Sequence, residues 1–223
     1  QKKYRGYLIM LTEIIIGETV IGPEHPPYII AELSGNHNGD INRAKSLIEI
    51  AKKSGASAVK LQTYTADSMT IDSDSNQFII KEGTWAGRRL YELYSDASTP
   101  WDWFEELFAY AKDIGITIFS SPFDLKAVEL LEELRAPAYK IASNELIDWP
   151  LLEAVVRTGK PIIISTGAAS KQDIGDTLEF INDIGGGQVV VLHCVSAYPA
   201  LPEESYLGTM VDVRDSFGVL VGL

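Results

Sequence analysis

The chain has 223 residues, 46% of them hydrophobic and 22% charged, which is enough to bury a sizeable core in one domain. Its formal net charge of −12 argues against nucleic acid and anionic membrane surfaces as partners, because both attract basic patches. Cys194 is the only cysteine, so an internal disulfide is excluded and a reducing compartment fits.

The amino-terminal segment divides into an expected extension and a hairpin. Residues 1–9 precede the first methionine, Met10, and we treat them as an upstream extension. Two short β-branched runs flank Gly17 and Glu18, which predicts an antiparallel hairpin over residues 13–22. We expect this hairpin to close the lower end of a barrel.

From Tyr28 onward, apolar runs of strand length alternate with helical patterns. A strand at 28–32 is followed by a helix at 41–53, for which Asp40 is the expected N-cap. The next strand, at 57–62, leads into a segment at 67–98 that is too long for a bare loop. We interpret this segment, which contains Trp85, as a lid or side wall.

The alternation continues to the last residue. The expected helices are 100–113, 124–134, 151–158 and 171–184, and the expected strands are 117–121, 138–142, 161–167, 189–193 and the start of a seventh at 218–223. Right-handed crossovers make these strands parallel. We therefore predict an α/β fold, an incomplete TIM-type (β/α)8 barrel over residues 10–223, with about six strand-helix units. A complete barrel takes ~250 residues.

Polar residues end several of these apolar strands. Lys60 and Gln62 share one strand face, Lys140 lies in another strand, and Ser143 and Ser165 follow strand ends. A lysine inside an apolar strand is rare unless it is paired, so these residues favour a clamp for phosphate or carboxylate. Such clusters lie at the mouth of an α/β barrel.

Other interpretations of these residues stay open. Lys60 and Lys140 could be structural partners of Glu32 and Glu145. Either lysine could instead form a Schiff base, as in class I aldolases. Ser165 could be a simple strand-end cap.

Two carboxylates are candidates for acid-base catalysis. Glu32 and Glu145 lie near apolar strand ends, where the environment can tune the pKa of a carboxyl group. Surface ion pairing is the alternative for both. Asn36 lies in a loop rich in hydrogen-bonding groups, and we expect it to bind substrate, although Asn38-Gly39 by itself indicates only a turn.

The sequence does not build a metal site from these residues. The segment 72–76 begins like a calcium loop, but Gln77 and Gly83 occupy the positions that need glycine and glutamate. The three histidines, His25, His37 and His193, have no close ligand spacing.

Five ordered motifs together resemble the sialic acid synthase family. They are AELSGNHNGD (31–40), VKLQTY (59–64), YKIASNE (139–145), IISTG (163–167) and HCVSAYP (193–199). The resemblance runs from about residue 13 to the last residue. The segment WAGRRLYELY (85–94), followed by TPWDW (99–103), is similar to the pseudaminic acid synthase branch. We rank that branch above the N-acetylneuraminate synthase branch.

The resemblance implies condensation of phosphoenolpyruvate with a 2,4-diacetamido-2,4,6-trideoxy hexose, with release of phosphate by carbon-oxygen cleavage. The alternative acceptor is N-acetylmannosamine. By resemblance, the residues around phosphoenolpyruvate are Lys60, Lys140, Ser143 and Ser165. Those that face the sugar or the reacting centre are Glu32, Gln62, Glu145 and Tyr198.

The family pattern extends beyond Leu223. There the resemblance implies the histidines that bind a divalent metal (Mn or Mg), and an antifreeze-like domain that this chain lacks. We therefore expect a piece of a longer enzyme that forms a homodimer, and expect this chain alone to be inactive. A noncatalytic phosphoenolpyruvate- or sugar-binding fragment is the alternative. No apolar run reaches the ~20 residues needed to cross a bilayer and no signal peptide is recognisable, so we expect a cytoplasmic protein.

Overall fold

The computed structural model describes residues 13–197 and 200–223, which form two compact units. The first unit combines the described part of Gln1–Pro27 with Pro137–Leu223, and the second is Tyr28–Ala136. The expected extension at 1–9 lies outside the described residues. No helix in the described ranges is long and apolar enough to cross a membrane.

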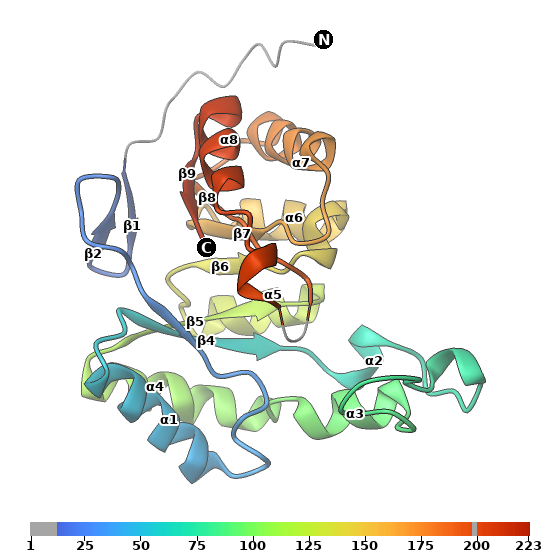
Figure 1. Cartoon of the computed structure of the whole chain (residues 1–223). Helices are drawn as coiled ribbons and strands as arrows, with labels where there is room; N and C mark the ends of the chain where they lie inside the picture. The colour runs from blue at the N-terminus through green and yellow to red at the C-terminus, as the bar shows by residue number, and fades with distance from the viewer. Residues whose placement is uncertain (1–12, 198–199) are drawn as a thin grey trace. The chain divides into compact units, whose positions relative to one another are not determined.

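The second unit is built on three parallel strands in the order β3, β4, β5, of which Figure 1 labels β4 and β5. The strands are β3 (Ile30–Glu32), β4 (Ala58–Thr63) and β5 (Thr117–Pro122), and the helices are α1 (Ile41–Lys53), α2 (Ala66–Met69), α3 (Leu90–Ala97), α4 (Phe104–Ile114) and α5 (Leu125–Glu133). Short 3-10 helices occupy Asn76–Phe78 and Trp101–Trp103. The Asp40 carboxylate accepts a hydrogen bond from Asn42 N–H, which confirms the N-cap of α1.

The first unit contains four parallel strands in the order β6, β7, β8, β9, and an antiparallel hairpin. The hairpin is β1 (Ile14–Ile16) with β2 (Thr19–Ile21), and the parallel strands are β6 (Tyr139–Ile141), β7 (Ile162–Ser165), β8 (Val189–Leu192) and β9 (Leu220–Gly222). The helices are α6 (Trp149–Val156), α7 (Lys171–Asp183) and α8 (Gly208–Phe217), with 3-10 turns at Asn144–Ile147 and Pro202–Glu204. The α/β class, the parallel strands and the hairpin are confirmed.

Most strands are shorter than the sequence predicts, β7 by three residues, and two of them, β3 and β6, are shortened by local contacts. Ile29 precedes β3 because its N–H donates to the Ser57 hydroxyl at 3.2 Å instead of to a neighbouring backbone carbonyl. Ala142 follows β6 because its carbonyl accepts from Glu145 N–H at 3.2 Å and so begins a 3-10 turn. The expected helix at 100–113 also begins as a 3-10 turn and becomes α-helical at Phe104.

The α8 helix was not located from the sequence. Only Val213 and Phe217 are buried on it, so its apolar face is narrow. It ends at Gly218, which has a φ of +66° and donates its N–H to Arg214 O at 2.8 Å. The seventh strand therefore begins at Leu220 and not at Gly218.

The hairpin contributes two isoleucines to the core of the first unit. Ile14 and Ile16 are buried, whereas Ile15 between them is 53% exposed, as alternation along a strand requires. Ile15 N–H donates to the Gln188 side chain at 3.2 Å, which ties β1 to the segment before β8. The hairpin is therefore a structural part of the first unit.

The Ile16→Ala substitution should lower the free energy of unfolding by about 2–5 kcal/mol, because it removes fully buried methyl groups and leaves a cavity. The matched Ile15→Ala substitution should change it by less than about 0.5 kcal/mol. Urea denaturation measures both values. Equal effects of the two substitutions would show that the hairpin does not pack as described.

Candidate active site

An ion pair joins the carboxyl ends of β3 and β4. Glu32 and Lys60 are register partners on the two parallel strands, and the Lys60 ammonium pairs with Glu32 Oε2. Lys60 Nζ also lies 3.4 Å from Ser121 Oγ at the end of β5. The Lys60 side chain is 13% exposed, so this pairing compensates for the cost of its burial. The structural partner that the sequence suggested for Lys60 is thus present.

The other oxygen of Glu32 is held by the residue that follows Leu33. Ser34 N–H and Ser34 Oγ both donate to Glu32 Oε1, at 3.0 Å and 3.2 Å. Ser34 has a φ of +42°, an uncommon conformation for a non-glycine residue that turns the chain back toward the carboxylate. Glu32 is therefore a fixed, ion-paired carboxylate at the end of its strand.

The loop after β3 is anchored by a buried histidine. His37 Nδ1 accepts from Gly39 N–H at 3.1 Å, and its Nε2 lies 3.4 Å from Thr99 Oγ1. The Trp103 ring meets the imidazole edge-on, with centroids 5.4 Å apart. Burial lowers the pKa of His37. The neutral imidazole of His37 therefore anchors this loop.

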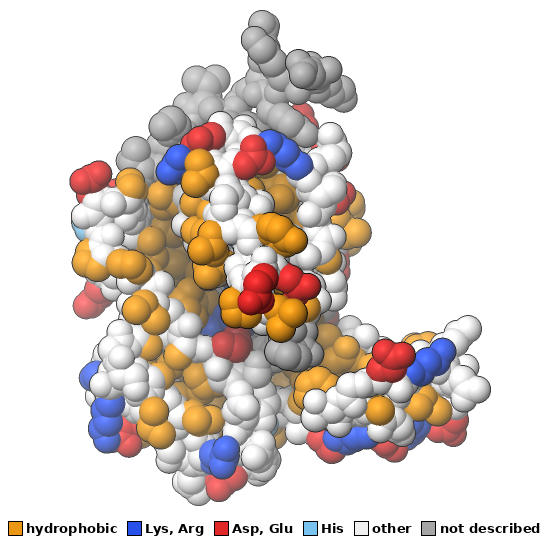
Figure 2. Space-filling view, in the orientation of Figure 1, with side chains coloured by type: hydrophobic (Ala, Val, Ile, Leu, Met, Phe, Trp, Pro, Cys, Tyr) orange, Lys and Arg blue, Asp and Glu red, His pale blue; other side chains and the backbone are white. Residues whose placement is uncertain are grey.

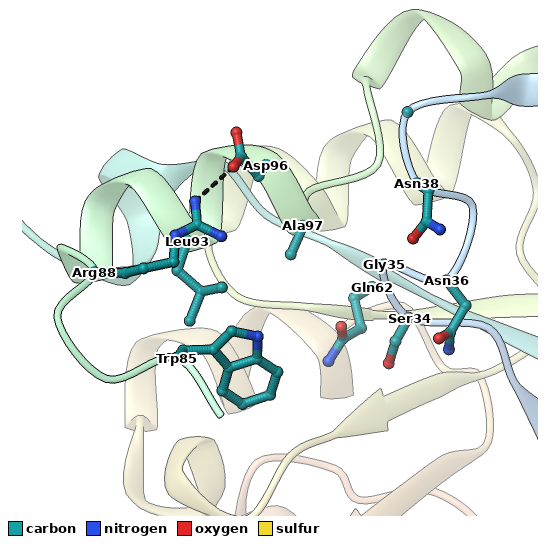
Figure 3. Close-up of a pocket in the computed structure, with 11 residues that line it drawn as sticks. Ser34, Gly35, Asn36, Asn38, Gln62, Trp85, Arg88, Leu93, Asp96 and Ala97 are labelled. Atoms are coloured by element: carbon teal, nitrogen blue, oxygen red, sulfur yellow. Dashed lines mark hydrogen bonds and ion pairs between the residues drawn. The ribbon is translucent and has the colours of Figure 1, made fainter. Parts of the chain in front are cut away.

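This loop forms one wall of a cavity of about 750 Å³ in the second unit. The side chains of Ser34, Asn36 and Gln62 point to the same side, as Figure 3 shows. Asn36 Nδ2 donates to Leu33 O at 3.0 Å, which fixes its amide. Gln62 follows Lys60 by two residues on the same face of β4, so the cavity lies next to the Glu32–Lys60 pair.

The opposite wall belongs to the segment that the sequence suggested as a lid or side wall. Trp85 faces Gln62 and Ser34, and Leu93 of α3 lies beside it (Figure 3). Basic and acidic side chains are interspersed over the surface of this segment, at the lower right of Figure 2. Arg89 pairs there with Asp72 and Asp74 at 2.7 Å and 2.8 Å. The carboxylates that resembled a calcium loop are thus bound by an arginine.

A second cluster lies at the carboxyl ends of the strands of the first unit. Lys140 is buried in β6, and its ammonium donates to Ser165 Oγ and, at 2.9 Å, to Ile141 O. Ser143 Oγ accepts from Gly167 N–H at 3.0 Å, and Cys194 Sγ donates to Ser165 Oγ at 3.3 Å. The structure thus brings together Lys140, Ser143 and Ser165, which the sequence placed in one phosphate site.

Gly167 makes this cluster possible. A Cβ atom at this position would lie 3.2 Å from Ser143 Oγ and 3.3 Å from Cys194 Cβ, and it would collide with Ser196 Oγ. A side chain would therefore push the hydroxyl groups apart. The ammonium group, the hydroxyl groups and the backbone N–H are donors of the kind that a phosphate or carboxylate accepts from.

Glu145 lies in the 3-10 turn just after this cluster. Burial raises the pKa of its carboxyl group, the nearby charge of Asp148 adds to the increase, and the ammonium of Lys140 opposes it. Glu145 can therefore keep its proton at a pH where an exposed glutamate has lost it. A protonated carboxyl group at a strand end is suited to act as a general acid.

The remaining expected residues have simpler outcomes. Tyr198 lies outside the described residues. His193 Nε2 lies 2.7 Å from Ser205 O, a backbone partner within the first unit. Within residues 13–197 and 200–223, no group of three or more His, Cys, Asp or Glu side chains lies close enough to hold a metal ion.

Several residues of these clusters were not predicted as site residues from the sequence. Ser121 contacts Lys60, Cys194 contacts Ser165, and Trp85 and Arg88 line the cavity. The position of Ser121 at a strand end was an available signal. For Trp85 and Arg88, the signals were the unusual length of the segment 67–98 and the family-like motif at 85–94, which contains both residues.

We expect the free energy of unfolding to fall as the pH drops below about 6.5, the ordinary pKa of histidine. Between that value and the lower pKa of folded His37, the unfolded chain binds a proton that the folded chain does not, so stability rises with pH. The His37→Gln variant should show a weaker pH dependence, because it has no imidazole at this buried position. Denaturation at several pH values between 5 and 7 measures this, and an unchanged slope in His37→Gln would contradict it.

Comparison with known proteins identifies relatives over most of the chain. A pseudaminic acid synthase of Helicobacter pylori is 48% identical over 198 residues, which cover 89% of this chain and 58% of that protein. A pseudaminic acid synthase of Campylobacter jejuni is 43% identical over 196 residues, covering 88% and 57%. The chain therefore spans less than two thirds of the length of these relatives.

A solved structure gives the same relationship. The N-acetylneuraminic acid synthetase of Leptospira borgpetersenii matches with a TM-score of 0.83 at 28% identity, over 94% of this chain and 68% of that one. The family model described as the NeuB family matches residues 47–223, well over half of the chain. The chain therefore belongs to the NeuB family.

Proposed function

We propose that the whole protein condenses phosphoenolpyruvate with an acetamido sugar to form a nonulosonic acid, and releases phosphate. The observation that carries this proposal is the cluster of Lys140, Ser143, Ser165 and Gly167, which gathers donors for an anion at the carboxyl ends of parallel strands. The identity to pseudaminic acid synthases supports pseudaminic acid as the product and a 2,4-diacetamido-2,4,6-trideoxy hexose as the acceptor.

Phosphoenolpyruvate is the anionic substrate in this proposal. Lys140, Ser143 and Ser165 bind it through charge-assisted and neutral hydrogen bonds. Lys60 is assigned to the same substrate, and Glu32 keeps its ammonium in place. Asn36, Gln62 and Tyr198 are assigned to the sugar.

The two glutamates divide the proton transfers of the proposed reaction. The enol carbon of phosphoenolpyruvate forms a bond with the aldehyde carbon of the open-chain sugar, and protonated Glu145 donates its proton to the aldehyde oxygen. Water then adds to the cationic carbon and loses a proton to the ionised Glu32. The carbon-oxygen bond to phosphate breaks last: the phosphate takes the bonding electrons and the proton of the new hydroxyl group, and the carbon becomes a ketone. General acid-base help of this kind is worth roughly 100- to 10,000-fold in rate.

Other properties of the whole protein are carried over from the family as proposals. A divalent metal (Mn or Mg) would polarise the aldehyde, but the described residues do not form a site for it and no step above depends on it. We also propose a (β/α)8 barrel, a homodimer and a cytoplasmic location. The net charge of −12 supports the absence of a nucleic-acid partner.

The test is an assay of phosphate release by the whole protein, with phosphoenolpyruvate and each candidate sugar. We expect turnover with the diacetamido trideoxy hexose and much less with N-acetylmannosamine. The structural match to an N-acetylneuraminic acid synthetase favours N-acetylmannosamine as the second candidate, and a preference for it would change the assigned product. Binding without turnover of either sugar would support a noncatalytic protein.

Replacement of Lys140 by alanine should weaken phosphoenolpyruvate binding by about 1.5–3 kcal/mol, the usual value of a hydrogen bond to a charged group. Calorimetric titration measures this loss, and Lys126→Ala, a change of an exposed lysine on α5, is the control. Borohydride trapping distinguishes the clamp from Schiff-base chemistry. A covalent pyruvyl adduct on Lys140 would refute the clamp.

The Glu145→Gln variant should be more stable than the unchanged protein at neutral pH, and inactive. Because burial raises the pKa of Glu145, the unfolded chain loses this proton at a lower pH than the folded chain does, so the free energy of unfolding falls as the pH rises above about 4.5. The neutral amide avoids that cost but cannot donate the proton. Thermal denaturation at pH 4 and pH 7, together with the phosphate assay, measures both effects. A variant that is active and no more stable at pH 7 would contradict the assignment.

A further inference from the structure

Trp85 is a large aromatic side chain that lines the cavity of the second unit and remains 50% exposed. Exposed single hydrophobic residues are common, but an indole that forms one wall of a cavity with polar groups facing it is characteristic of a binding site. Trp85 has no part in the proposed proton transfers or in the binding of phosphoenolpyruvate.

The indole is carried by a defined turn. Ala86 N–H donates to Gly83 O at 3.2 Å and Arg88 N–H donates to Trp85 O at 3.1 Å. Two further backbone hydrogen bonds link Ile80 to this turn, to Gly87 at 2.8 Å and to Arg88 at 2.9 Å. The backbone therefore fixes the position of Trp85, although its ring is half exposed.

The charges of the cavity wall favour a neutral ligand. Among the lining residues that the structure describes, the charged side chains are Arg88 and Asp96, and they pair with each other at 2.6 Å (Figure 3). This pair links the Trp85 turn to α3. The cavity thus differs from the Lys140 cluster, which gathers donors for an anion.

The two walls differ in polarity. One carries the Ser34 hydroxyl and the Asn36 and Gln62 amides, which both donate and accept hydrogen bonds. The other carries the apolar surfaces of Trp85 and Leu93. A neutral sugar with hydroxyl or amide groups on one edge and C–H or methyl groups on the other matches both walls.

We propose that Trp85 determines the sugar specificity of this protein, by packing its indole against the apolar edge of a neutral acetamido sugar that carries a methyl group in place of a hydroxyl. The inference rests on the proposed function, which it deepens by naming the residue that selects the substrate class. Ser34 contacts Glu32, so a sugar in this cavity lies next to the Glu32–Lys60 pair.

The first test is a kinetic comparison of Trp85→Ala, Trp85→Phe and a control, Ile71→Ala, in the whole protein. Ile71 is a 63% exposed residue of the same segment that does not line the cavity. Trp85→Ala should raise the KM for the 6-deoxy sugar roughly 10-fold or more, and Trp85→Phe less. The preference over N-acetylmannosamine should shrink, while the KM for phosphoenolpyruvate stays within about twofold. Ile71→Ala should change neither KM.

A binding measurement tests the same role of Trp85 if Trp85→Ala does not fold or if the protein does not convert either sugar. Labelling with 5-fluorotryptophan gives ¹⁹F signals that include those of the four tryptophans of this chain, and comparison with Trp85→Phe assigns the Trp85 signal. The Trp85 signal should shift when the 6-deoxy sugar is added and not when phosphoenolpyruvate is added.

The outcomes separate this inference from the proposed function. Turnover with an unmoved Trp85 signal and an unchanged sugar KM in Trp85→Ala would overturn the role of Trp85 and leave the condensation intact. Absence of turnover with both sugars would overturn the condensation, and a sugar-dependent shift of the Trp85 signal would then still support the sugar site. Neither turnover nor a shift would overturn both.

Discussion

The burial of lysine ammonium groups in apolar parallel strands is the constraint on which the candidate site depends. A charge that leaves water must gain a partner, or the strand is destabilised. Lys60 meets this requirement with Glu32, and Lys140 donates to Ser165 and to a backbone carbonyl. Polar residues at the strand ends therefore supply most of the partners of the two ammonium groups. The contacts that allow the lysines to be buried also bring together groups that can bind an anion.

The second unit adds a wall that no strand supplies. The loop after β3 lies so close to the end of α3 that a Cβ atom at Gly35 would be 2.8 Å from Ala97 O. His37 fixes the same loop from inside the unit through Gly39. The spacing between the amide wall and the Trp85 wall is thus set by backbone packing, which favours a cavity formed before a ligand enters.

Much of this arrangement was predictable, because it follows from the spacing of apolar residues along the chain and from the types of residue in the apolar runs. The alternation of strands and helices fixed the α/β class, and a lysine in an apolar run pointed to Lys60 and Lys140. Three features were not. The α8 helix has a narrow buried face, and the ends of β3 and β6 are set by a Ser57 hydroxyl and a 3-10 turn. The segment 67–98 was expected to be a lid or side wall, but the placement of Trp85 in one cavity with Gln62 of β4 depends on how that segment folds. Side-chain competition and long-range packing decide these features, and neither leaves a periodic signal in the sequence.

The proposed reaction joins phosphoenolpyruvate to a sugar with cleavage of the carbon-oxygen bond. Phosphoenolpyruvate labelled with ¹⁸O at the bridging oxygen tests it directly, by mass spectrometry of the released phosphate. We expect the label to leave with the phosphate, because in the proposed reaction water adds to carbon and the carbon-oxygen bond breaks. Unlabelled phosphate would mean that water attacked phosphorus, and it would contradict the proposed chemistry.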